Sequence, residues 1–300
     1  MFATTTVDAS LVRLRRIISA MNVNSELDRL QSEFGWRPEA VALSDVATGV
    51  WTNSRFRPEK SVYSDSQWTE FDVHLDESWW YNTRNKIILD GLRRHFLGGV
   101  LWDIGCGSGV VGKFLRDNGF EVMGIEPSAA GATLAARRGI TTFQGNLQDL
   151  SLPGNSIGAI SMFDVLEHLE NRQSALAEIH RVLQPEGLLF LSLPALQLLW
   201  SQFDEDGGHF LRYNKRVIRQ ELAENGFQIV ESRYFFVLTV IPLLVLRVIP
   251  YRFGMRRALA TGATLSAAGG MLGRISSWAE QRWTSRAPFG SSLFVVARKM

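Results

Sequence analysis

The chain has 300 residues, 46% of them hydrophobic, so it can form one large α/β domain with embellishments and does not require two domains. Its 32 basic and 30 acidic residues leave a formal charge of +2, which disfavours nucleic acid as a partner. Cys106 is the single cysteine, which rules out an intramolecular disulfide. The first residues lack the basic start and apolar core of a secretory signal, so we expect a cytoplasmic protein.

Residues 1–77 are predicted to form an N-terminal cap. Their polarity is mixed, and only Leu11 to Leu30 shows helical spacing of apolar residues. From Ser78 the pattern predicts an amphipathic helix that would pack on one face of a sheet. The main domain is therefore expected to span 78–300.

The middle of the chain alternates short apolar runs with helical patterns, which is typical of βαβ units and a parallel sheet. Strands are predicted at 100–104, 121–125, 157–163, 187–193, 228–235 and 291–297. Helices are predicted at 110–118, 128–138, 172–183 and 215–225. A turn at Gln184 to Gly187 should precede the strand at 187–193.

A glycine-rich loop, DIGCGSG, closes the first of these strands and opens a helix. Gly105, Gly107 and Gly109 would let the backbone approach a ligand where helix N–H groups point outward, although a purely structural turn is an alternative. Val110 stands where the dinucleotide fingerprint G-x-G-x-x-G needs its third glycine, so the spacing disfavours pyrophosphate. Asp103 could bind an ammonium group, directly or through water.

A carboxylate, Glu126, ends the second strand. It could accept hydrogen bonds from both ribose hydroxyls, whereas its structural alternative is a helix N-terminal charge worth at most about 1 kcal/mol. An NAD enzyme would use the same acid, so Glu126 favours an adenosyl ligand without naming it. Asn146 and Leu147, in the run QGNLQDL, could contact the adenine edge, or be ordinary loop residues.

Together these motifs resemble the class I S-adenosylmethionine-dependent methyltransferases, in the group typified by ubiquinone-biosynthesis O-methyltransferases. The resemblance spans Ser78 to about Phe235 and rests on DIGCGSG (103–109), Glu126, Gly145-Asn146, FDVLEHLEN (163–171) and RVLQPEGLLFLSLP (181–194). It implies S-adenosyl-L-methionine as co-substrate. It also implies a Rossmann-like, mostly parallel sheet of seven strands with the last antiparallel. An apolar helical insertion at about 236–288, before the last strand, departs from the minimal fold.

Methyl transfer is an in-line displacement at a carbon activated by positive sulfur, so alignment and water exclusion are the main tasks. A proton acceptor is needed only for an acceptor such as a hydroxyl. His168 is the leading candidate for that base and His209 the second, with Phe163 expected against the adenine or sulfonium. The structural alternatives are a helix-start residue bonded to backbone for His168 and a loop residue for His209.

A divalent ion held by Asp164, Glu167, His168 and His209 is a further hypothesis, since carboxylate and imidazole ligands can hold an ion that polarises a hydroxyl. The D-x-x-E-H pattern resembles the E-x-x-E-H metal pattern of some O-methyltransferases that act on ubiquinone precursors or small-RNA ends. Asp164 replaces its first glutamate, and we favour the metal-free mechanism.

An aromatic turn, Trp79 to Tyr81, opens the helix before the core. The resemblance implies that this helix lines the cofactor pocket, so Arg84 would pair with the methionyl carboxylate and the aromatics would wall the acceptor cleft. Ordinary packing is the alternative. Arg212 and Tyr213 could contact an anionic acceptor, although a surface ion pair would look the same.

The most apolar stretch, Tyr234 to Leu246, is too short to cross a hydrocarbon core of about 30 Å, which takes roughly 20 helical residues. The arginines that follow it suit anionic headgroups and favour peripheral membrane contact: Arg247, Arg252, Arg256 and Arg257. A buried hairpin or homodimer interface competes and is slightly favoured.

An apolar lid near the substrate mouth suggests a small-molecule or lipid-linked acceptor. Three functions stay open on the sequence alone. The first is methyl transfer, with O-methylation favoured over N- or C-methylation. The others are an NAD-dependent oxidoreductase on a Rossmann fold and a non-catalytic membrane-associated binding protein.

Overall fold

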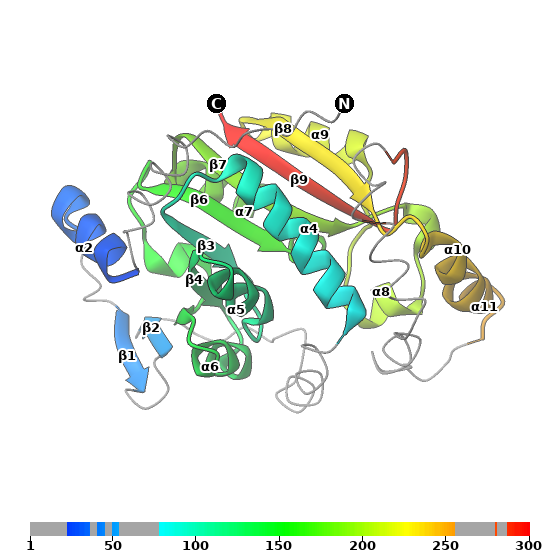
Figure 1. Ribbon diagram of the computed structural model, residues 1–300, viewed down its shortest axis with the longest axis horizontal. Helices are drawn as coiled ribbons and strands as arrows, with labels where there is room; N and C mark the ends of the chain where they lie inside the picture. Colours follow the sequence, from blue (N-terminus) through cyan, green and yellow to red (C-terminus); the bar gives the residue numbers. More distant parts are fainter. Residues whose placement is uncertain (1–22, 37–40, 46–49, 54–77, 256–279, 281–286) are drawn as a thin grey trace, which may run out of the picture.

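The computed structural model describes residues 23–36, 41–45, 50–53, 78–255, 280 and 287–300. Nine strands in this part of the chain form one sheet in the order β1-β2-β5-β4-β3-β6-β7-β9-β8 (Figure 1). The strands are β1 (Val41–Asp45), β2 (Val50–Asn53), β3 (Val100–Ile104), β4 (Glu121–Glu126), β5 (Thr141–Gln144), β6 (Ile157–Phe163), β7 (Leu183–Pro194), β8 (Phe227–Phe235) and β9 (Ser292–Lys299).

The centre of the sheet consists of five parallel strands, β5, β4, β3, β6 and β7, and β9 runs antiparallel between β7 and β8. The predicted mostly parallel sheet with an antiparallel last strand is therefore confirmed. The chain moves from β3 outward to β5 and then returns to β6 on the other side of β3. Such a switch point leaves a crevice at the carboxyl ends of the two central strands, where ligands of α/β sheets bind.

Two strands extend the sheet beyond the seven predicted from the sequence. β2 pairs in parallel with β5, and β1 pairs antiparallel with β2. Both lie in the segment 1–77, where no strand was predicted because runs of four or five residues show too little alternation. Tertiary packing decides their conformation: Val50 is buried, and the Trp51 ring lies 6.1 Å from that of Phe143 on β5.

Helices cover both faces of the sheet. On one face lie α4 (Trp79–His95), α5 (Val110–Asp117) and α6 (Ala129–Arg137), which Figure 1 shows together in front of the strands. On the other face lie α2 (Val23–Phe34), α7 (Arg172–Val182) and α9 (Lys215–Glu224). Short turns complete the described elements: η2 (Leu147–Leu150), η3 (Leu166–His168), η4 (Gln197–Leu199) and α8 (Gln202–Asp206).

The alternation of side chains along β3 divides the core into two layers. Leu101 packs with the helices α4 and α5, whereas Trp102 packs on the opposite face. There the Trp102 ring stacks on Phe143 at 6.1 Å. Both faces of the parallel strands are thus covered, which explains why these strands read as nearly continuous apolar runs.

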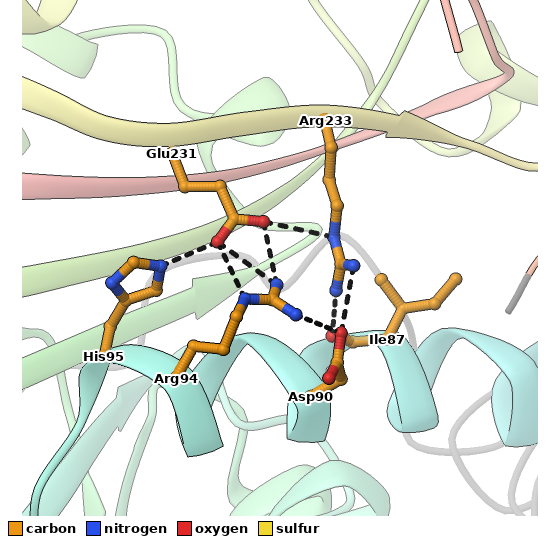
Figure 2. A network of polar contacts seen from close by, with 6 residues as sticks. All are labelled: Ile87, Asp90, Arg94, His95, Glu231 and Arg233. Carbon is orange, nitrogen blue, oxygen red and sulfur yellow. Dashed lines mark hydrogen bonds and ion pairs between the residues drawn. The ribbon is translucent and has the colours of Figure 1, made fainter. Parts of the chain in front are cut away.

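A polar network fixes the carboxyl-terminal half of α4 against β8 (Figure 2). The Glu231 carboxylate accepts hydrogen bonds from Arg94 Nη2 at 2.8 Å and pairs with His95 Nε2 at 2.7 Å. Arg233 donates to Asp90 Oδ2 at 3.0 Å and to the Ile87 carbonyl at 2.7 Å. These contacts set the direction of α4, and hence the place of the aromatic turn at its other end.

Most predicted elements agree with the structure to within two residues, but β7 begins four residues early. The segment predicted as a turn, Gln184 to Gly187, lies inside this strand. Leu183 pairs with Ile157, and the ladder with β6 then shifts register before it continues. Glu186 has a φ of 64°, so the turn conformation is retained as an irregularity within the strand.

The insertion before the last strand is helical where it is described. α10 (Val240–Leu243), the π-helical turn η5 (Leu244–Val248) and α11 (Ile249–Arg252) follow one another without a break. No helix in the described ranges is long and apolar enough to cross a membrane. Residues 256–279 of the predicted insertion, which include Arg256 and Arg257, fall outside the described residues.

Candidate active site

The glycine loop connects β3 to α5 at the switch point of the sheet. Its three glycines have φ values of 69°, 57° and 78°, a region that other residues rarely adopt: Gly105, Gly107 and Gly109. At Gly109 a Cβ atom would lie 2.8 Å from the Cα of Ala135 in α6. The loop therefore needs glycine for its conformation and for close helix packing, in addition to any ligand contact.

Glu126 lies under the loop, with its carboxylate held by two backbone N–H groups. Gly107 N donates to Oε2 at 2.9 Å, and Ser128 N donates to Oε1 at 2.8 Å. Burial raises the pKa of Glu126 to about 7, while these two hydrogen bonds act in the opposite direction. Each oxygen keeps a second lone pair, so the carboxylate can still accept hydrogen bonds from a ligand hydroxyl.

Asp103 is buried at the end of β3, next to β6 across the switch point. Ser161 on β6 donates a hydrogen bond from Oγ to Asp103 Oδ1 at 2.7 Å. Burial raises the pKa of Asp103 to about 7, and the Ser161 hydrogen bond and the charge of Arg84 partly offset this. A cationic group that docked here would stabilise the ionised carboxylate.

Arg84 on α4 is buried in a box of aromatic rings. Its guanidinium lies 5.0 Å from the Trp80 ring centroid and 4.9 Å from that of Tyr81. Nη1 pairs with Asp164 directly after β6, and Nε has no hydrogen-bond partner in the structure. The predicted pairing of Arg84 with the methionyl carboxylate stays a prediction, and in this structure Asp164 holds that guanidinium.

The aromatic turn also contacts the insertion. The rings of Trp80 and Phe236 stack at 5.5 Å, and Trp79 meets Phe236 edge to face at 5.8 Å. A hollow lined by Tyr81, Asn85 and Val110 lies between α4 and the first turn of α5. The aromatic turn of α4 therefore lies between the glycine loop and the segment that follows β8.

Three further residues predicted at the cofactor site follow β5 and β6. Asn146 N donates to Asp149 Oδ2 at 2.7 Å, which caps the short helix η2. The side chain of Leu147 is buried in the core, so only its backbone is left to contact a ligand at this loop. Phe163 is buried at the carboxyl end of β6, in the core layer shared with α4 and α5.

Glu167, His168 and His209 come together at the same sheet edge. The His168 and His209 rings lie 4.5 Å apart at an angle of 82°, although the two residues are 41 positions apart in the sequence. Glu167 is 1% exposed, and its Oε2 has no hydrogen-bond partner. Burial and the nearby Asp164 charge raise the pKa of Glu167 well above its usual range.

The two histidines differ in their surroundings. Burial and the neighbouring His209 lower the pKa of His168 to about 4, and His168 Nδ1 has no partner. His209 Nδ1 instead pairs with Asp204 Oδ1 at 2.9 Å. A carboxylate on Nδ1 fixes the imidazole tautomer and leaves Nε2 to accept a proton.

Asp204 was not singled out from the sequence, although it organises this part of the site. Its carboxylate is fully buried and also accepts hydrogen bonds from Arg212 Nε at 2.7 Å and from Ser201 N at 2.9 Å. His209 and Arg212 lower the pKa of Asp204 despite its burial. The D-x-x-x-x-H spacing, Asp204 to His209, was the available signal, but it does not reveal that the loop folds back on itself.

The residues predicted for a divalent ion fit it in part. Glu167, His168 and His209 each offer one ligand atom, and these atoms all lie within 4.8 Å of one another. Asp164 does not join them, because Arg84 and Ser192 Oγ bind its two oxygens.

Arg212 and Tyr213 are buried inside the fold, so the surface ion pair considered for them is wrong.

Comparison with known proteins gives one consistent family. A family model described as a methyltransferase domain matches residues 80–232. A probable S-adenosylmethionine-dependent methyltransferase of Mycolicibacterium smegmatis is 30% identical over 121 residues, which are 40% of this chain and 47% of that protein. A ubiquinone biosynthesis O-methyltransferase of Haemophilus ducreyi is 29% identical over 106 residues, 32% of this chain and 45% of that protein.

Solved structures give the same fold. A phosphoethanolamine N-methyltransferase 2 of Haemonchus contortus, in complex with S-adenosyl-L-methionine, superposes with a TM-score of 0.52. It is 16% identical, and the superposition covers 80% of this chain and 58% of that one. The matched part of this chain spans about half the length of the two curated relatives.

Proposed function

This chain belongs to the methyltransferase-domain family of class I S-adenosylmethionine-dependent enzymes, as its motifs predicted, and we propose that it methylates a hydroxyl of a small-molecule or lipid-linked acceptor. The observation that carries the proposal is the switch point of the sheet. There, two buried carboxylates and an oriented imidazole meet at one edge. The family match favours this reaction over hydride transfer to a nicotinamide.

The two buried carboxylates would hold opposite ends of the donor. We assign the methionyl ammonium to Asp103 and the ribose hydroxyls to Glu126, with the glycine loop supplying N–H groups for the methionyl carboxylate. Both carboxylates have a pKa of about 7, so binding of a cation or of hydroxyl donors would favour their ionised forms.

His209 is the stronger candidate for the general base, a reversal of the ranking made from the sequence. Asp204 orients its ring through Nδ1, whereas His168 has no partner on Nδ1 and a pKa of about 4. A base whose conjugate acid is stabilised by a carboxylate accepts a proton more readily at neutral pH. Asp204 is then a positioning residue, because it acts through His209.

The proposed methyl transfer is a single displacement in which one bond breaks and one bond forms. When bound, the donor supplies a methyl group whose bond to the sulfonium breaks with its electron pair moving to sulfur. The acceptor oxygen forms the new bond to carbon, and its proton goes to His209 Nε2. The chain's own residues align the two reactants and exclude water.

A second role for the imidazole cluster is to hold a divalent ion that polarises the acceptor hydroxyl. The closeness of Glu167, His168 and His209 supports it, and two imidazoles with one carboxylate suit a transition metal better than magnesium. We rank it below the metal-free base, because burial raises the pKa of Glu167 and a protonated carboxyl group is a poor metal ligand.

The test begins with donor binding. S-adenosylhomocysteine should raise the melting temperature of the protein, and NAD should not, because a ligand that binds only the folded form stabilises it. Methyl-labelled donor should then transfer its label to an acceptor in the soluble or lipid fraction of source cells. Stabilisation by NAD alone would overturn the proposal.

Metal dependence separates the two roles of the cluster. The metal-free mechanism predicts that chelation with EDTA leaves the transfer rate unchanged. A loss of rate that manganese or zinc restores would assign the cluster to an ion. Isothermal titration of the apoprotein with each ion gives a readout that does not depend on activity.

A further inference from the structure

The helical insertion is apolar on the face that it turns away from the domain. Its exposed side chains, named here the apolar ridge, are Leu238, Ile241, Val245, Leu246, Ile249, Phe253 and Met255. Ile241 and Phe253 are 72% and 78% exposed. A surface helix normally carries polar residues on its outer face, and an apolar face of this kind marks a binding surface.

The opposite face of the same helices is fixed to the domain. Val240 and Val248 pack with Leu199 in a small separate core. The Arg247 guanidinium lies 4.6 Å from the Phe203 ring, and Tyr251 donates a hydrogen bond to Glu205 on α8. The ridge is therefore held at a fixed place, and Figure 1 shows α10 and α11 next to α8 at one end of the molecule.

The charged residues of the segment that carries the ridge have one sign. From Ser232 to Ala279 the sequence contains six arginines and no Asp, Glu or Lys. Arg252 is exposed at the end of α11, and Arg256 and Arg257 come four and five positions later in the sequence. A second copy of the chain would bring arginines against arginines, whereas anionic headgroups complement this charge.

We propose that the apolar ridge docks this protein on the surface of a bilayer that contains anionic phospholipids. The ridge would enter the boundary between headgroups and acyl chains, and Arg252 at its end would contact phosphates. Asp204 and His209 belong to the α8 segment that the insertion packs on, so docking would bring the candidate active site close to lipid. The inference does not require methyl transfer and can fail independently of it.

Flotation of the full chain with vesicles tests the docking. The protein should float with phosphatidylglycerol/phosphatidylcholine vesicles and only weakly with pure phosphatidylcholine, and raised salt should release it. The double variant Ile241→Ser, Phe253→Ser should lower vesicle affinity at least tenfold, because both side chains would leave the acyl boundary. Arg252→Gln should lower it about fivefold.

A matched control substitutes exposed apolar residues elsewhere. Leu97 and Val230 are 46% and 38% exposed and lie outside the insertion. Leu97→Ser, Val230→Ser should leave flotation unchanged, and the melting temperature of each variant shows that it folds. Binding of S-adenosylhomocysteine in all variants separates loss of docking from loss of the donor site.

Three results would overturn the proposal. The first is an absence of flotation at every phosphatidylglycerol content. The second is a solution dimer, measured by light scattering, that the Ile241→Ser, Phe253→Ser variant converts to monomer. The third is amide exchange at 240–252 that does not change when vesicles are added, which would mean that another part of the chain covers the ridge.

Discussion

The candidate site has a donor half and an acceptor half, and the two halves consist of different kinds of groups. The donor half, between β3 and β5, is made of backbone N–H groups and carboxylates at strand ends. All of these groups lie within 25 residues after Asp103 in the sequence. The acceptor half combines η3 with the loop after β7, about 40 residues apart. Groups that lie close together in the sequence can be recognised as a motif. Groups that only folding brings together are found in the tertiary structure. Substitutions in each half and a pH titration test this contrast.

The largest effect is expected in the donor half. Asp103→Ala should abolish methyl transfer and lower S-adenosylhomocysteine affinity about a hundredfold, since a charge-assisted hydrogen bond is lost. Isothermal titration measures the affinity. Glu33→Ala, which removes an exposed carboxylate paired with Arg29, is the matched control and should change nothing. Full activity in Asp103→Ala would mean that the ammonium binds elsewhere.

The acceptor half should lose rate without losing donor affinity. His209→Ala should lower kcat about a hundredfold or more, the usual contribution of a general base. His168→Ala should lower it less than tenfold. Asp204→Asn should shift the pH–rate profile as well as lower kcat, because Asp204 acts through His209. Equal losses in the two histidine variants, restored by added metal, would favour the ion.

The glycine loop allows a comparison of strain with packing. Gly109→Ala should lower the free energy of unfolding by about 3 kcal/mol, because its Cβ would be strained and would also meet Ala135. Gly119 has a φ of 86° but no atom near the added Cβ, so Gly119→Ala should cost about 1 kcal/mol. Urea unfolding measures both, and equal losses would contradict the tight packing at Gly109.

A pH dependence of donor binding is expected without any substitution. Asp103 and Glu126 both have a pKa raised to about 7, so each is protonated in the ligand-free protein below that value. S-adenosylhomocysteine affinity should therefore weaken as pH falls below about 7, by up to tenfold per unit for each group.

The same shifts have a defined sign for stability. The folded protein binds more protons than the unfolded chain between about pH 4 and 7, so these two groups make the ligand-free protein less stable as pH rises through that window. Titration calorimetry and melting curves from pH 5.5 to 8.5 measure both effects. A flat affinity profile would show that the donor does not contact these carboxylates.

Sequence alone determined the central fold, and it predicted the residues of the donor half. The glycine loop, Glu126 and the alternation of strands and helices are local patterns, and β3 and β6 have the predicted bounds. β1 and β2 were missed because strands of four or five residues carry little periodicity, and the pairing of β2 with β5 and of β1 with β2 decides their conformation. Family membership, inferred from the same motifs, is confirmed.

Only the tertiary structure decided which histidine is oriented and which surface is left apolar. Asp204 reaches His209 because a loop folds back, and Arg84 takes Asp164 out of the predicted ion site. The apolar run of the insertion could equally have been buried, and packing against α8 leaves one of its faces exposed. These outcomes depend on contacts between distant segments, and the physical reason they escape prediction is that residue spacing encodes only local conformation.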